Sequence, residues 1–487
     1  GINVAVLGHP GFVFDETENT VQFQQKFNYY AGQHTLKAGL VVISADHQLF
    51  GGGNVDGNYT VRLTEGQLDQ VRQLGRGSAL NINDIPSDAE VLGYAVELRP
   101  TSFGARQTIY SAYVEDEWHA TSRLTATLGL RYDYDDLSRG GAEEGDFDNI
   151  APRVNLNYKL GRRSSLRAGY GVFYEKIPYA IYSDALQQNT TSTDYRKQIQ
   201  ALVDQGVLPK DTDVEAVTFE GNLSGFASNV DYLQGPSAES LQEQREGVFS
   251  NERRILNPNG YDNPYTHQMA LGYQLQMKSN SLFYVDLVHN RSFNLLRLRN
   301  LNAAAPYSVD PDNPQVRTMA EADATRPIPI VDGNSAVING EPLTGVARNV
   351  IMSETAGESR YYAASFNFQK GRGDDDYSFR LNYTLSYLEN NTEDINFRAM
   401  DANDFEAEWG PSINDRRHII NTIFTYYPAK NLSLTVAGLI QSGQPINRTP
   451  LPVSFVVVDE NGNPVQEQLT GPDGRPAFDQ NGDPFFF

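Results

Sequence analysis

The sequence has no cysteine and no long apolar run, and each absence excludes a class of protein. Among 487 residues there are no Cys and only 5 Met. Without cysteine the chain can form no disulfide framework, no thiolate metal site and no cysteine nucleophile. The densest apolar run, at 452–458, is far shorter than the roughly 18 residues that a membrane-spanning helix needs. The chain is therefore not a helical membrane protein.

Basic residues are also scarce. Lys and Arg number 39 against 61 Asp and Glu, which gives a formal net charge of -22. This charge argues against nucleic acid or an anionic membrane surface as a partner. An acidic exterior suits cations or basic ligands, but it can equally serve to keep long loops soluble. Charge alone leaves these two interpretations open.

Alternating polarity is the main pattern in the residues that are present. The chain is rich in Tyr (27), Phe (24) and Gly (41), which favours strands and turns. From Leu124 to Tyr134 the even positions are apolar and the odd positions are Thr, Gly, Arg or Asp. Such alternation predicts a strand with one apolar and one polar face. The pattern recurs in about a dozen segments: 21–30, 35–45, 107–118, 124–134, 154–160, 166–174, 269–277, 282–290, 361–370, 377–387, 417–427 and 432–440.

The connections between these segments distinguish a barrel from a sandwich. Very short turns alternate with long polar excursions, which lie at about 46–106, 135–150, 175–263, 291–360 and 389–416 and from 442 onward. All the long excursions therefore project from one end of the sheet. This layout is typical of outer-membrane barrels, with short periplasmic turns and long extracellular loops, whereas sandwich strands average only about 5 to 6 residues. We predict an all-β fold, an antiparallel transmembrane β-barrel with long extracellular loops.

The polar face of the predicted strands carries charged side chains. They are tolerable there because that face meets water or other protein in the lumen and not lipid. The residues concerned are Arg131, Asp133, Lys159, Arg167 and Arg380.

Catalytic patterns are poor. The sequence has no HExxH, no GxSxG and no phosphate-binding glycine loop, and its 7 His are scattered singly. Carboxylate clusters such as Glu143/Glu144 fall in predicted loops, where they solvate the chain. We predict no catalytic residue and no enzymatic activity.

One short stretch has the spacing of a calcium loop. Asp479, Asn481 and Asp483 place oxygen ligands at alternate positions beside Gly482. A plain polar turn explains the same residues, because such short motifs occur by chance. Calcium at these three residues is the one cofactor hypothesis that the sequence suggests.

Several segments resemble, in the same order along the chain, the barrels of TonB-dependent receptors of the Oar-like type. Each segment is short, but together they span nearly the whole chain. They are GQHTLKAG at 32–39, YVEDEWHATSRLTATLGLRY at 113–132, IAPRVNLNYKL at 150–160, LRAGYGVFY at 166–174, NPYTHQMAL at 263–271, NYTLSYLEN at 382–390, DRRHI at 415–419 and QSGQP at 441–445.

The resemblance implies a barrel of about 22 strands filled by an N-terminal plug, with a TonB-contacting box ahead of the plug. This sequence has only about half of those strands, and no plug is recognisable before the first one. We therefore expect residues 1–487 to be part of one outer-membrane β-barrel domain, with the plug and the C-terminal strands absent from this chain.

Two functions follow from the resemblance. The first is TonB-dependent uptake of an extracellular ligand through the bacterial outer membrane, with loops near 175–263 and 291–360 selecting the ligand. The second is an adhesion or structural barrel that binds partners through the same loops without import. The expected partners are outer-membrane lipid, TonB through the plug, and an unidentified extracellular ligand; nucleic acid is not among them.

Overall fold

The fold is taken from a computed structural model of the chain, which describes most of the residues between 12 and 446. The described residues are 7, 12–53, 57–98, 104–187, 193–218, 223–227, 230–235, 252–277, 280–306, 318–331, 334–400, 403–446, 457–458 and 464–465.

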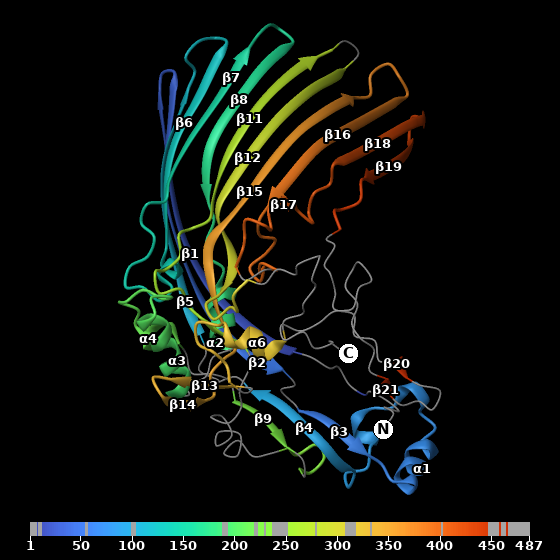
Figure 1. Cartoon of the computed structure of the whole chain (residues 1–487). Coiled ribbons are helices and arrows are strands. Elements are labelled where there is room, and N and C mark those ends of the chain that lie inside the picture. The colour runs from blue at the N-terminus through green and yellow to red at the C-terminus, as the bar shows by residue number, and fades with distance from the viewer. Residues whose placement is uncertain are drawn as a thin grey trace.

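One large antiparallel sheet dominates the described part of the chain (Figure 1). Twelve strands follow one another across it in chain order, as the alternation predicts. They are β1 (Phe12–Ala31), β2 (His34–Gly53), β5 (Gly104–Trp118), β6 (Leu124–Asp135), β7 (Ile150–Lys159), β8 (Ser164–Tyr174), β11 (Tyr265–Gln276), β12 (Ser281–Asn300), β15 (Asn349–Lys370), β16 (Tyr377–Asn390), β18 (His418–Ala429) and β19 (Leu432–Gln441). Two short strands complete the sheet, β10 (Glu252–Ile255) beside β15 and β17 (Gly410–Pro411) beside β16.

All the short turns lie at one end of this sheet, at the top of Figure 1, and the long connections lie at the other. We call these the short-turn end and the long-loop end. A two-residue turn joins β1 to β2, where Ala31 pairs with His34, and another joins β18 to β19, where Ala429 pairs with Leu432. Gly32 has a φ of +61° in the first of these turns, a left-handed conformation that two-residue hairpins require and that glycine adopts without strain.

Several strands continue well past the predicted boundaries. β1 and β2 have 20 residues each and β15 has 22, so at about 3.3 Å per residue they reach far beyond an apolar band of about 25 Å. The connection predicted at 291–360 is therefore shorter, because β12 runs to Asn300 and β15 begins at Asn349. Asn294, with φ 56°, marks a bulge at which the register shifts, and the bulge breaks the alternation that the prediction needs.

The sheet curls along its length but does not close into a barrel (Figure 1). Within the described residues β1 pairs only with β2, and β19 pairs only with β18, so these two strands form its edges.

The long connections contain the helices and the smaller sheets. Helices of the described residues are α1 (Glu65–Gln73), α2 (Tyr179–Gln187), α3 (Thr193–Asp204), α4 (Val214–Val217) and α6 (Met319–Ala324), with the 3-10 turns η1 (Gly77–Ala79), η2 (Ile82–Asp84) and η3 (Asp136–Arg139). The smaller sheets are β3 (Asn58–Arg62) with β4 (Glu90–Leu98) and β9 (Leu223–Ala227), β13 (Ser335–Ile338) with β14 (Glu341–Thr344), and β20 (Val457–Val458) with β21 (Pro464–Val465). No helix in the described part of the chain is both long and apolar enough to cross a membrane.

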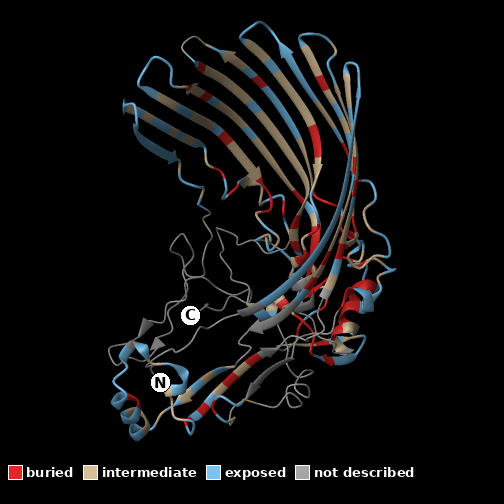
Figure 2. Cartoon of the chain, turned by 180° about the vertical axis from the view of Figure 1, so that it is seen from behind, coloured by how far each residue is buried: buried red, intermediate tan, exposed pale blue. Residues whose placement is uncertain are grey.

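Burial is concentrated at the long-loop end. Figure 2 shows the sheet mostly as intermediate and exposed residues, with buried residues gathered where the strands meet the helices. The largest hydrophobic cluster lies there, in the connections between β8 and β11 and between β12 and β15.

Candidate functional site

The two faces of the main sheet differ in chemistry from one edge to the other. Residues paired across neighbouring antiparallel strands share a face, so the register assigns each side chain to one of them. On one face Leu128 pairs with Val154, and Leu271 pairs with both Ala168 and Leu287. The apolar rows continue from β1 to β19. We call this the outward face, since apolar rows of this kind are the ones that contact lipid in a membrane barrel.

The opposite, inward face carries paired charges and amides. Lys37 Nζ lies 2.9 Å from Glu115 Oε1 and 3.3 Å from Glu117 Oε2. In the middle of the sheet Arg167 Nη2 lies 2.9 Å from Asp286 Oδ1. Ion pairs of this kind are stable on a face that water or protein covers, because burying charges in lipid is energetically costly.

The charged residues predicted for the lumen all lie on this inward face. Arg131 binds Asp133 with two nitrogens, at 2.7 and 2.8 Å, and also donates to the Ser111 hydroxyl at 2.8 Å. Lys159 is opposite Ser165 and Arg380 is opposite Gln369. The polarity alternation therefore predicted the facing of these side chains, although not their partners.

Two long connections, between β8 and β11 and between β12 and β15, fold together into one body at the long-loop end. We call this body the cap: residues 193–217, 252–256, 301–306, 318–331 and 334–352. Its core is a single cluster of buried side chains to which both connections contribute. Its members include Tyr195, Ile199, Leu202, Leu208, Ile255, Leu301, Ile328, Leu343, Val346 and Val350. The loops predicted to select a ligand thus form a packed structure.

Gln198 on α3 joins the two connections through the backbone of Ala347. Its Nε2 donates to Ala347 O at 2.8 Å, and its Oε1 accepts from Ala347 N at 2.8 Å. The Gln198 side chain is fully buried. This amide satisfies both backbone groups of Ala347, groups that are costly to bury without partners.

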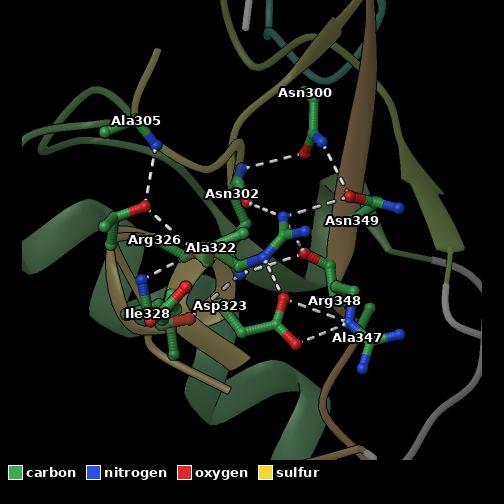
Figure 3. A network of polar contacts seen from close by, with 12 residues as sticks. Asn300, Asn302, Ala305, Ala322, Asp323, Arg326, Ile328, Ala347, Arg348 and Asn349 are labelled. Atoms are coloured by element: carbon green, nitrogen blue, oxygen red, sulfur yellow. Dashed lines mark hydrogen bonds and ion pairs between the residues drawn. The ribbon is translucent and has the colours of Figure 1, made fainter. Parts of the chain in front are cut away.

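A second polar lock involves Asp323, shown in Figure 3. Its carboxylate accepts from Arg326 Nε at 2.7 Å and from Arg348 Nε at 3.0 Å, and all three side chains are largely buried. Arg326 also donates to the carbonyl oxygens of Asn302 and Arg348 at 2.6 and 3.0 Å. The network fastens α6 to the segment that leads into β15.

The segment after β8 is tied to the barrel wall by Asp135, at the end of β6. Asp135 accepts from the side-chain amide of Gln107 at 2.9 Å and from the backbone of Ile177 at 2.8 Å. Ile177 in turn packs with Leu256 and Tyr261 in a second buried cluster. The segment just after β8 is therefore held to the sheet by Asp135 and packs against Leu256 of the cap.

Asp148 and Arg253, both outside the membrane-spanning segments, have shifted pKa values. A hydrogen bond between the side chains of Asp146 and Asp148, together with the negative charge of Asp146, raises the pKa of Asp148. Burial lowers the pKa of Arg253 to about 10, beside the ring of Tyr195 at 5.2 Å. Arg253 is still charged at neutral pH.

A smaller aromatic cluster lies on the sheet of β3, β4 and β9. The rings of Tyr59 and Tyr94 are 4.8 Å apart, and Tyr232 meets Tyr59 edge-on at 5.4 Å. Burial, with Tyr59 beside it, raises the pKa of Tyr94 to about 12. A hollow of about 510 Å³ adjoins this cluster, with Asn83, Asp84 and Tyr232 among its lining residues.

The comparison with protein families agrees with this two-faced sheet. Residues 6–139 and 136–433 match the family described as outer membrane beta barrel domain. The chain belongs to this family. The barrel domain is accordingly a protein of the bacterial outer membrane, as the layout of strands and turns predicts.

Individual relatives cover the barrel domain only in part. The TonB-dependent transporter Oar of Myxococcus xanthus is 26% identical over 195 residues, which are 37% of this chain and 17% of that protein. This similarity confirms the Oar-like resemblance. Among solved structures, the siderophore receptor PirA from Acinetobacter baumannii has a TM-score of 0.44 at 13% identity. The superposition covers 87% of this chain and 42% of the PirA chain. The outer membrane transporter YddB from Escherichia coli has a TM-score of 0.44 at 9% identity, and the superposition covers 85% of this chain and 40% of the YddB chain. The barrel domain thus spans less than half the length of each.

The remaining predicted sites stand as follows. Asp479, Asn481 and Asp483 lie outside the described residues, so the calcium hypothesis stays a prediction. In the part of the chain that the structure describes, no three His, Asp or Glu side chains converge as a metal site would require. No sequence pattern pointed to Gln198 or Asp323, because each acts on a partner in another part of the chain.

Proposed function

We propose that this chain is the barrel portion of a TonB-dependent outer-membrane receptor, which captures a ligand at the cap and imports it through the lumen. The long-loop end would be extracellular and the short-turn end periplasmic. The observation that carries the proposal is the cap itself. Two connections, distant in sequence, share one buried core and are joined by Gln198, and the buried Asp323 network fixes the second of them. Such a preorganised surface suits selective binding.

The inward face supports the import step of the proposal. A wall of ion pairs and amides, such as Asn382 Nδ2 donating to Asn367 Oδ1 at 2.6 Å, suits contact with water or with a folded plug. A plug and a TonB-contacting box are what the Oar-like resemblance implies for the full-length protein. Transport energy would reach the ligand through them.

The test is an uptake assay on a strain lacking the gene, complemented with the full-length protein. Labelled siderophores, glycans and peptides are offered with and without a protonophore, because TonB-driven import needs the energised inner membrane. Uptake that requires both the protein and the energised state supports the proposal. Surface binding that persists with no accumulation in the cell would instead indicate an adhesion barrel.

A variant in the cap sharpens this assay. Gln198→Leu removes the amide that fastens the two connections, so ligand binding should weaken while the amount of assembled protein stays the same. The matched control is Gln200→Leu on the same helix, because Gln200 is exposed and bonds only locally to Asp204 at 3.0 Å.

A further inference from the structure

Two neighbouring turns at the short-turn end carry three arginines, which we call the basic cluster: Arg123, Arg162 and Arg163. Arg123 lies in the turn between β5 and β6, and the other two occupy the centre of the turn between β7 and β8. The backbone N–H of Lys159 donates to the carbonyl oxygen of Arg123 at 2.8 Å, so the two turns lie side by side. The backbones of the three arginines are therefore within about two strand spacings, or about 10 Å.

The arginines of the basic cluster are exposed and have no acidic partner. All three residues are exposed. Among the ion pairs that the described residues form, none includes any of the three. Like charges held this close repel one another, and an anion between them would relieve that repulsion.

The surroundings do not neutralise the basic cluster. The carboxylates on the adjoining strand are Glu115, Asp116 and Glu117, at the end of β5. Lys37 Nζ pairs with both glutamates, and the ring of His34 lies 2.7 Å from Asp116. Without counting any charge on the nearby histidines, these three carboxylates are outnumbered by five basic side chains, which leaves two positive charges. The five are Lys37, Arg123, Lys159, Arg162 and Arg163.

The other fully described turns at the same end have no such surplus. The turn between β1 and β2 has no Lys or Arg, and the turn between β18 and β19 has only Lys430. In the turn between β15 and β16, Arg372 is accompanied by three consecutive carboxylates at 374–376. That turn starts three strands beyond β8, about 15 Å away, which exceeds the screening length of about 8 Å at physiological salt. Its acids therefore do not offset the basic cluster.

The outward face next to the basic cluster ends in aromatic and aliphatic side chains. Tyr158 pairs with Leu124 and Leu166 in the last paired outward row before the two turns. Tyr158 is 40% exposed, and Trp118 at the end of β5 is 39% exposed. Tyr and Trp at strand ends of a membrane barrel lie at the level of the lipid headgroups. The basic cluster is thus placed where headgroup phosphates lie.

We propose that the basic cluster binds the phosphate of an anionic phospholipid, whose acyl chains lie against the outward row of Leu124, Tyr158 and Leu166. A guanidinium binds phosphate through several N–H donors at once, which suits arginine for this role. The exposed apolar row beside the cluster favours a lipid over a soluble acidic partner, which would contact the turns alone. With the short turns periplasmic, the lipid belongs to the periplasmic leaflet, which is the phospholipid leaflet of the outer membrane.

The experiment uses full-length protein in nanodiscs made from equal amounts of phosphatidylglycerol and phosphatidylethanolamine, with native mass spectrometry of the lipids that it retains. The wild-type protein should retain phosphatidylglycerol in preference to phosphatidylethanolamine. The double variant Arg162→Gln/Arg163→Gln should weaken that preference about thirtyfold, since each basic side chain near an anionic headgroup contributes about fivefold. The matched control Arg372→Gln/Lys430→Gln removes two positive charges from other turns at the same end and should leave the preference unchanged.

Three results would overturn the proposal. They are equal retention of the two lipids by the wild-type protein, equal losses in the two double variants, and displacement of the lipid by an equimolar amount of soluble glycerol phosphate, which would mean that the acyl chains contribute nothing. Heat-modifiable migration of each variant verifies that its barrel is assembled. Both leaflets of a nanodisc have the same composition and no uptake is measured, so the outcome is separate from that of the transport assay.

Discussion

The main sheet and the cap bury their apolar side chains against different surroundings. On the outward face Leu128 is 46% exposed and Val436 is 69% exposed within the protein, because lipid is the phase that covers them. In the cap Tyr195, Ile199 and Leu202 are fully buried by other parts of the same chain. The sheet therefore depends on backbone pairing and on the membrane, whereas the cap depends on an ordinary hydrophobic core.

This difference predicts that the two regions will tolerate substitutions differently. A sheet residue has only two strand neighbours, so the effect of a substitution on stability depends on the face on which the residue lies. A cap residue has partners from distant segments, so the effect depends on whether those partners lose a hydrogen bond or ion pair. Four predictions separate these two kinds of sensitivity.

The largest effect is expected at Asp323 in the cap. Asp323→Asn leaves Arg326 and Arg348 largely buried without their carboxylate, which should destabilise the cap by about 3 to 5 kcal/mol. Limited proteolysis of the full-length protein in bilayers should then cut within 301–348, while heat-modifiable migration of the sheet is unchanged. Glu341→Gln is the control, because its ion pair with Lys197 is exposed and should contribute less than about 1 kcal/mol. Equal proteolysis of the two variants would contradict the prediction.

The next effect tests the facing of the sheet. Leu130→Lys places an ammonium group in lipid opposite Val114 and Pro152 and should cost about 2 to 4 kcal/mol, because the charge loses its hydration without gaining a partner. Thr127→Lys should be tolerated, since Thr127 faces inward opposite Glu117. The denaturant midpoints of both full-length variants in bilayers measure the difference. A cysteine at position 128 with a lipid-depth probe is the decisive check, and absence of quenching by lipid-borne quenchers would disprove the outward assignment.

A smaller effect is expected at Gln198. Gln198→Leu keeps the side-chain volume but leaves the N–H and C=O of Ala347 without their partners, which should destabilise the cap by about 1 to 3 kcal/mol. The amide of Ala347 should then exchange its hydrogen faster. Gln200→Leu should leave that exchange rate as it is. If the hydrogen-exchange rate of the Ala347 amide is unchanged in Gln198→Leu, the Gln198 side chain contributes nothing to the stability of the cap.

The smallest effect concerns Asp148, in the connection between β6 and β7. Its pKa is raised in the folded protein by Asp146, so the stability that its protonated form contributes is complete below the ordinary Asp pKa of about 3.9 and is lost as the pH rises through the raised value. Asp148→Asn should therefore match the wild-type protein at about pH 3 and gain relative stability toward pH 7. Denaturant midpoints over this pH range measure the gain, and parallel curves for the two proteins would refute it.

The sequence was most informative in the strands, where the polarity of each single residue indicates whether its side chain faces lipid or the lumen. In the strand at Leu124–Tyr134 each position is either apolar or polar according to the face on which it lies, so periodicity alone located the strand, its facing and its turns. Periodicity failed at Asn294, where one bulge shifts the phase of the alternation, and the end of β12 was taken for a loop. It also failed in 349–358, because residues 350–354 of β15 are all buried there, beside β10, and alternation disappears.

The sequence by itself determined the transmembrane sheet, its strand order and the two chemical faces, because lipid and water act on each side chain locally and with a period of two. Only the tertiary structure decided the cap, the locks at Gln198 and Asp323, and the basic cluster. Each of these depends on residues about twenty to a hundred and fifty positions apart that become neighbours only on folding. A buried amide that satisfies a distant backbone has no local signature in composition or spacing, and neither has a group of arginines that two separate turns bring together.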